Sequence, residues 1–172
     1  MNKFVKLAAL AATVFATTPT LAAPVGVTGA PPSATARIIR PLSLTSTGSL
    51  NFGTIVLNGV SANRTVALSS ANVLDCGAGT TELQCSGATS VPTYNVRGTN
   101  NQVVTVIKTA TNLTNAQDGS TLSMTPTGAA SVTLTNSGAP GLDFNIGGSI
   151  VIGTATTDGV YSGTVNVQVD YQ

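Results

Sequence analysis

The sequence predicts an all-β protein from three observations. Aromatic residues make up only 4% of the chain, and β-branched residues, glycine and serine are abundant; β-branched side chains suit a pleated surface and lose rotamer freedom in helices. Short apolar alternations recur along the chain, each followed by Gly, Asn, Asp or Pro. No segment has the pattern of the crossover helices that a parallel sheet requires. Together these features favour an Ig-like antiparallel β-sandwich.

Residues 1–22 have the residue order of a bacterial secretory signal peptide. Lys3 and Lys6 precede an apolar run over residues 7–16, and small residues follow. We expect cleavage after Ala22, because cleavage one residue later would put Pro24 directly behind the scissile bond. The run is shorter than the roughly 18 apolar residues of a membrane span. The prediction is an exported mature chain without a membrane span, from a Gram-negative bacterium.

Residues 23–33 predict an extended N-terminal tail. They hold three prolines and two glycines, a composition that supports neither a helix nor a central strand. The sandwich is expected to occupy residues 34–172.

The first strands are predicted on either side of a tight turn. Residues 34–45 are expected as a strand, and residues 50–57 as the next one. Asn58-Gly59 accepts the positive φ angles of a hairpin turn, which would return the chain into a strand through Val66 and Leu68.

Cys76 and Cys85 are the only cysteines. An oxidising compartment lets such a pair close, so we predict a structural disulfide that staples a loop. A metal or redox site would need the close Cys-x-x-Cys spacing or a histidine, and the chain has no histidine.

The second half of the chain continues the alternation. A turn is expected at Asp118-Gly119. Gly147-Gly148 is expected to separate the strand through Leu142, Phe144 and Ile146 from the next strand at residues 150–152. The apolar residues predicted to face the core are Tyr94, Val96, Val104, Val106, Leu122, Met124, Val132, Leu134, Leu142, Phe144 and Ile146.

The C-terminal segment carries the strongest strand pattern. Its apolar residues and glycines share one parity, while polar residues occupy the other, which makes one face apolar and one wet. The residues on the apolar parity are Tyr161, Gly163, Val165, Val167, Val169 and Tyr171, with Gly159 ahead of them.

This ending resembles the last strand of chaperone–usher pilus subunits. Such subunits end in an alternating strand with a penultimate tyrosine, here Tyr171, and a glycine fourteen residues from the end, here Gly159. The Gly-x-Tyr-x-Gly lead-in and Leu50-Asn51-Phe52-Gly53 are also similar to spore-coat-U-like secreted domains and to a related bacterial family of unknown function.

The resemblance implies an incomplete sandwich that a donor strand completes. In pilus subunits a periplasmic PapD-like chaperone, and then the next subunit's N-terminal arm, supplies the missing strand by β-augmentation. The implied partners are other pilus or coat subunits, that chaperone and an outer-membrane usher. The implied donor arm is the tail, whose apolar residues are Val25, Val27, Ala34, Ala36 and Ile38.

The sequence lacks the residues that nucleic-acid binding or catalysis would need. Without Lys3 and Lys6, five of the seven basic residues remain against six acidic ones, a net charge of −1, and the five form no basic stripe for nucleic acid. Histidine, the commonest general base, is absent. We therefore expect no enzyme, no cofactor and no metal.

Two functions remain open. The first is an exported structural subunit of a surface fibre or coat that assembles by strand exchange. The alternative is a self-contained secreted Ig-like binding or coat protein that does not polymerise.

Overall fold

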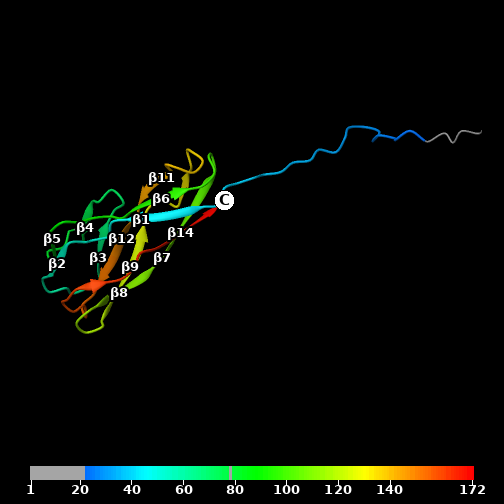
Figure 1. Ribbon diagram of the computed structural model, residues 1–172. Coiled ribbons are helices and arrows are strands. Elements are labelled where there is room, and N and C mark those ends of the chain that lie inside the picture. Colours follow the sequence, from blue (N-terminus) through cyan, green and yellow to red (C-terminus); the bar gives the residue numbers. More distant parts are fainter. Residues whose placement is uncertain (1–21, 78) are drawn as a thin grey trace, which may run out of the picture. The chain divides into compact units, whose positions relative to one another are not determined.

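The computed structural model describes residues 22–77 and 79–172 (Figure 1). The predicted signal peptide, apart from Ala22, lies outside the described residues. Within them the chain is all-β, as the sequence predicts, and contains no helix. The strands are β1 (Ser43–Thr47), β2 (Thr54–Leu57), β3 (Arg64–Leu68), β4 (Leu74–Cys76), β5 (Leu83–Ser86), β6 (Thr93–Arg97), β7 (Val103–Thr109), β8 (Thr111–Asn115), β9 (Thr121–Thr127), β10 (Ser131–Thr133), β11 (Leu142–Asn145), β12 (Gly147–Ile152), β13 (Tyr161–Ser162) and β14 (Asn166–Tyr171).

The chain divides into two compact units, residues 1–37 and 38–172. The described part of the first unit, residues 22–37, is exposed and contains no strand. The strand predicted over residues 34–45 is wrong before Ser43, where β1 begins. The side chain of Ile38 is 91% exposed and Pro41 has no N–H to donate to a ladder, so an apolar parity alone does not bring this stretch into a sheet.

Four antiparallel sheets form the sandwich of the second unit. Their strand orders are β1-β6-β11, β2-β5, β10-β7-β14 and β13-β8-β9-β12-β3-β4. One core cluster lies between β2-β5 and the six-stranded sheet, and includes Phe52, Leu83, Val66 and Met124. A second lies between β1-β6-β11 and β10-β7-β14. Two faces of sheet therefore enclose each cluster, which is the sandwich arrangement.

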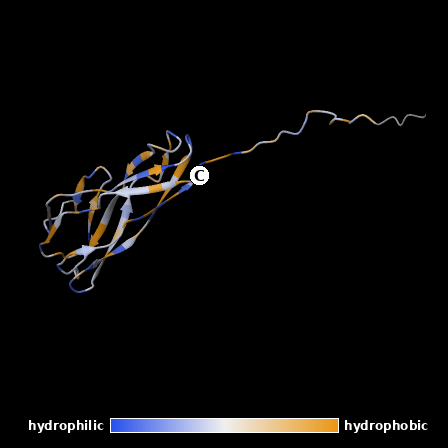
Figure 2. Ribbon diagram, viewed as in Figure 1, coloured by the Kyte–Doolittle hydropathy of each residue, from blue (hydrophilic) through white to orange (hydrophobic). Residues whose placement is uncertain are grey.

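The predicted alternations are confirmed in the burial of the strands. Along β9 every second residue is buried, including Leu122 and Met124. Val96 on β6 and Val104 on β7 are fully buried. Figure 2 shows hydrophobic and hydrophilic residues interleaved along the strands, as two-sided sheets require.

The hairpin predicted at Asn58-Gly59 is wrong. Gly59 does adopt a positive φ of 72°, but β2 pairs with β5 while β3 pairs with β4 and β12. The chain crosses from one sheet to the facing one, so that the residues next to β2 and the residues of β3 approach the same core cluster from opposite sides.

The interruption predicted at Gly147-Gly148 is also wrong, because both glycines are buried residues of β12. A Cβ at Gly147 would lie 2.6 Å from the carbonyl carbon of Ser69 and 2.8 Å from the nitrogen of Ser70. These glycines allow a close approach of two backbones inside a strand. In the sequence, a glycine pair with this role looks the same as a glycine pair at a turn.

The Cys76–Cys85 disulfide is confirmed. It joins β4, an edge of the six-stranded sheet, to β5 of the facing two-stranded sheet. The bond therefore ties the two layers of the sandwich together as well as closing a short loop.

Candidate functional site

The C-terminal segment forms two short edge strands. β13 pairs only with β8, and β14 pairs only with β7, among the strands that the structure describes. The other edge of each strand faces no ladder. A free strand edge offers unpaired N–H and C=O groups to an incoming chain.

The single continuous strand expected over this segment is interrupted at residues 163–165. Here the chain moves from one sheet to another, and the Thr164 carbonyl accepts a hydrogen bond from Thr111 Oγ1 at 3.2 Å. A Cβ at Gly163 would lie 2.8 Å from the Asn112 carbonyl oxygen, so a close crossing explains this glycine.

The apolar parity of the segment faces the core but is incompletely covered. In β14 exposed and half-buried residues alternate strictly. The apolar side chains that pack on the core clusters while remaining half-buried are Tyr161, Val165, Val167, Val169 and Tyr171, whereas Gly159 and Gly163 are exposed.

A second pair of edge strands faces this segment. β1 pairs only with β6, and β2 only with β5, within the described part of the chain. Val56 and Leu57 on β2 are 48% and 37% exposed. Apolar side chains on both sides therefore lie beside edges that carry unused hydrogen-bonding groups.

An apolar groove opens between residues 50–57 and residues 156–165. Its volume is about 810 Å³. The side chains lining its interior include Leu113, Leu122, Met124, Ile150 and Ile152. All but Leu113 are buried members of a core cluster, so the groove gives access to the hydrophobic core itself.

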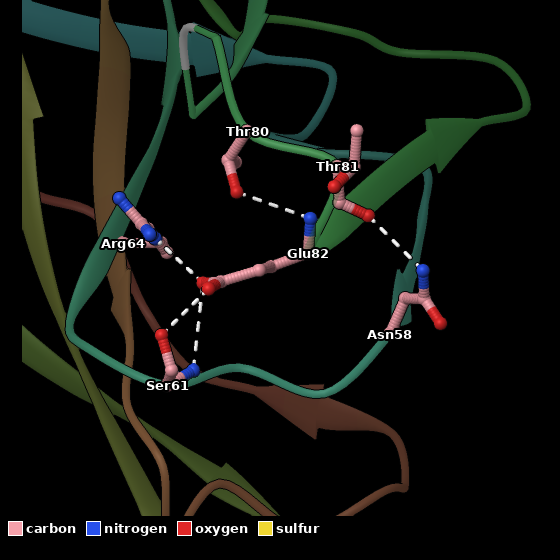
Figure 3. A network of polar contacts seen from close by, with 6 residues as sticks. All are labelled: Asn58, Ser61, Arg64, Thr80, Thr81 and Glu82. Carbon is pink, nitrogen blue, oxygen red and sulfur yellow. Dashed lines mark hydrogen bonds and ion pairs between the residues drawn. The ribbon is translucent and has the colours of Figure 1, made fainter.

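Glu82 anchors the rim that contains β2 (Figure 3). Its carboxylate accepts hydrogen bonds from Arg64 Nε at 2.8 Å and Ser61 Oγ at 2.6 Å. Asn58 Nδ2 donates to the Thr81 carbonyl at 3.2 Å. Hydrogen bonds from Arg64 and then Ser61 lower the pKa of Glu82 to about 2. This network fixes the connection between β2 and β3 to the start of β5.

Asn115 anchors the opposite rim. It is 2% exposed, and its Nδ2 donates to the Asp158 carbonyl at 3.0 Å while its Oδ1 accepts from the Gln117 amide at 2.9 Å. A Cβ at Gly159 would lie 2.7 Å from Asn115 Cγ. The absence of a side chain at Gly159 therefore makes room for the amide that holds the rim.

Hydroxyl groups extend this anchor to Tyr161. Its hydroxyl shares hydrogen bonds with Ser120 Oγ at 2.9 Å and Thr157 Oγ1 at 3.1 Å, and these contacts lower its pKa. The Thr157 hydroxyl also donates to Asp118 Oδ2 at 2.6 Å, which lowers the pKa of Asp118. The start of β13 is thus fixed to two neighbouring loops.

The proposed donor residues lie apart from any ladder. Val25, Val27, Ala34, Ala36 and Ile38 are all exposed and outside strands. Val25 and Val27 are 92% and 71% exposed.

The groove is lined mainly by apolar side chains. Among the residues described, no three His, Cys, Asp or Glu side chains gather as metal ligands would. Tyr94 is buried and stacks on Phe144 at 5.6 Å between ring centroids. The described chain also has no helix long and apolar enough to cross a membrane.

Sequence reasoning found one rim of the groove and missed the other. The alternation marked the C-terminal segment, but nothing marked residues 50–57 as its opposite side. The sequence predicted a strand over residues 50–57, and the Leu50-Asn51-Phe52-Gly53 similarity lies in the same stretch, but neither feature indicated a groove.

Comparison with known proteins places the sandwich in a family. The chain matches the model described as a domain of unknown function (DUF4402) over residues 42–171, and belongs to that family. The related bacterial family of unknown function expected from the sequence is thus supported. No curated protein and no solved structure matches the chain.

Proposed function

We propose that this DUF4402 domain is an exported, non-enzymatic structural subunit of a surface fibre or coat, which assembles by β-strand exchange. The observation that carries the proposal is the apolar groove between residues 50–57 and 156–165, whose strands β2 and β13 each have one edge without a ladder in the described chain. An extended chain laid in this groove would find main-chain partners on both sides and an apolar floor below, which are the two requirements of β-augmentation.

The occupant we propose is the N-terminal tail of a second copy. Residues 23–39 are exposed and outside strands, and this stretch extends to roughly 56 Å. The facing segment from Tyr161 to Tyr171 needs about 36 Å at the same rise. The tail is therefore long enough to cover the groove and still leave a connection to its own sandwich.

The apolar side chains of the tail supply the driving force. Four or five side chains at roughly 1.5 to 3 kcal/mol each give a gross gain on the order of 10 kcal/mol before the cost of ordering. Val25 and Val27 are almost fully solvated in the isolated chain, so nearly all of their apolar surface is available for burial. Export through the periplasm, with a PapD-like chaperone and an outer-membrane usher as transient partners, belongs to the same proposal.

Strand exchange can be tested on the mature chain, residues 23–172. Unboiled and boiled samples are compared on a denaturing gel over a range of protein concentrations. We expect a ladder of oligomers that boiling collapses to monomer. V25T/V27T keeps the β-branched shape but removes apolar surface, and should abolish the ladder; T28S, in the same tail, should retain it.

Two results would overturn the proposal. One is a monomer in every lane at every concentration. The other is a ladder that survives both V25T/V27T and deletion of residues 23–33, since another surface would then hold the oligomer. A full-length chain that is already monomeric, and that stays a stable monomer after this deletion, would favour the self-contained secreted domain.

A further inference from the structure

The hydroxyl of Tyr171 connects the end of β14 to the chain just before β1. It donates a hydrogen bond to the Arg40 carbonyl at 2.7 Å and accepts one from the Thr99 amide at 2.8 Å. The Arg40 amide in turn donates to Thr99 Oγ1 at 2.7 Å. The end of β14 is thereby connected to the residues just before β1, near the point marked C in Figure 1.

Gly98 leaves room for this bridge. A Cβ at Gly98 would collide with the Tyr171 hydroxyl and would lie 2.8 Å from Leu134 Cδ1. The Tyr171 ring also packs against the second core cluster. The ring is thus held by packing and its hydroxyl by two hydrogen bonds.

The length of the bridge suits the width of one strand. A tyrosine side chain with one hydrogen bond spans roughly 9 Å, close to two inter-strand spacings of about 4.8 Å. No ladder joins β1 to β14 in the described chain, although Tyr171 connects their ends. A single extended chain therefore fits between these edges.

We propose that Tyr171 is a positioning residue, a strut that holds β1 and β14 one strand apart so that the space between them is already open when a donor arrives. This inference rests on the proposed function. Without the strut, the half-buried side chains Leu44 and Val167 on the two edges would gain contacts by moving together, and a donor would first have to separate them.

The two tyrosines of the C-terminal segment differ in this respect. Tyr161 has the same parity as Tyr171, but its hydroxyl bonds Ser120 and Thr157, next to its own strand. Tyr161 lines the apolar groove between residues 50–57 and 156–165, and Tyr171 does not. The strut therefore acts on the space between β1 and β14, beyond the residues that line this groove.

The expected effect of Y171F on donor binding follows from the fraction of molecules in which the space between β1 and β14 is open. Losing the hydrogen bonds of one hydroxyl lowers the preference for the open state of this space by about ten-fold. The apparent affinity for a donor falls by the fraction of molecules that remain open. Y171F should thus weaken or slow donor binding several-fold, with ten-fold as the upper limit, while the aromatic packing is retained.

The test compares Y171F with Y94F in the mature chain carrying V25T/V27T, so that its own tail does not compete. Tyr94 lies in the same core cluster on β6, opposite Ser46 of β1, and its ring stacks on Phe144 of β11, so Y94F removes a hydroxyl that does not connect β1 to β14. A fluorescent peptide of residues 23–39 reports association, and hydrogen exchange reports the backbone amides of β1 and β14.

We expect several-fold slower peptide association in Y171F, up to ten-fold, wild-type association in Y94F, and greater protection of the β1 and β14 edge amides in unliganded Y171F as these edges approach. Equal association in all three proteins would overturn the strut, as would an equal loss in Y94F. If the parent protein binds no peptide, the proposed function fails. The exchange data then decide alone: raised edge protection in Y171F supports the strut, and unchanged protection refutes it.

Discussion

Replacing Gly159 with alanine tests whether this glycine exists to accommodate Asn115. Gly159 has a φ of 143°, a conformation that residues with a Cβ rarely adopt. The added Cβ would also lie 2.5 Å from Asn115 Nδ2 and 2.7 Å from Asn115 Cγ. The buried amide must therefore move, and its hydrogen bonds to Asp158 and Gln117 must break or lengthen.

The magnitude has two parts. Strain at a positive φ costs about 1 kcal/mol or more, and leaving a buried polar group unsatisfied costs roughly 1 to 3 kcal/mol. G159A should therefore lower the free energy of unfolding by about 2 to 4 kcal/mol, measured by urea denaturation. G119A is the matched control, because Gly119 has a φ of 75° with open space where the Cβ would lie, and should show only the strain.

A double-mutant cycle identifies the clashing partner. N115A should be destabilising alone, but N115A/G159A should be less destabilising than the sum of the two single variants, since the amide that the new Cβ meets has gone. Additivity within about 0.5 kcal/mol, or a G159A cost no greater than that of G119A, would refute the reasoning.

Three further predictions concern stability. Replacing Cys76 and Cys85 with alanine should lower the free energy of unfolding by about 3 kcal/mol, the chain-entropy value for a loop this short, as measured by urea denaturation; an unchanged value would show that the layers need no covalent tie. Because the folded-state pKa of Glu82 is about 2, its stabilisation is present above the unfolded pKa of about 4.3 and is lost as pH falls towards 2. E82Q should thus flatten the stability profile from pH 4.5 to 2, and an unaltered profile by thermal melting contradicts this. G147A should cost about 3 kcal/mol or more by the same assay, since the Cβ meets backbone of Ser69 that cannot move aside; a loss under 1 kcal/mol would contradict the close approach.

Local patterns could predict the strands but not their partners. The alternation of Leu122 and Met124 marks a strand with one buried face, because side chains on a strand have a period of two whichever strand lies beside it. The pairing of β2 with β5 instead of β3 depends on which sheet each strand joins. That choice depends on packing across the core, which a hairpin dipeptide such as Asn58-Gly59 does not encode.

The same limit explains what was found of the groove. The C-terminal parity identifies side chains such as Val167 and Val169 as core-facing, but their being half-buried follows only from the absence of a neighbour beyond β14. Residues 50–57 show no special periodicity, and they become a rim only because the fold places them opposite residues 156–165. Gly159 and Gly163 were noted for their positions, and their close contacts with Asn115 and Asn112 give those positions a physical cause.

Unpaired edges carry a cost that natural sandwiches usually avoid. Proteins that stay monomeric protect such edges with lysine, proline, bulges or a covering loop. Of the outward residues of β14, which are Asn166, Gln168 and Asp170, only Asp170 carries a charge, and an apolar groove lies beside β13. A sequence that keeps strict alternation up to such an edge retains the features that a donor strand recognises. This sparsely protected edge is therefore one of the observations on which the proposal of strand exchange rests.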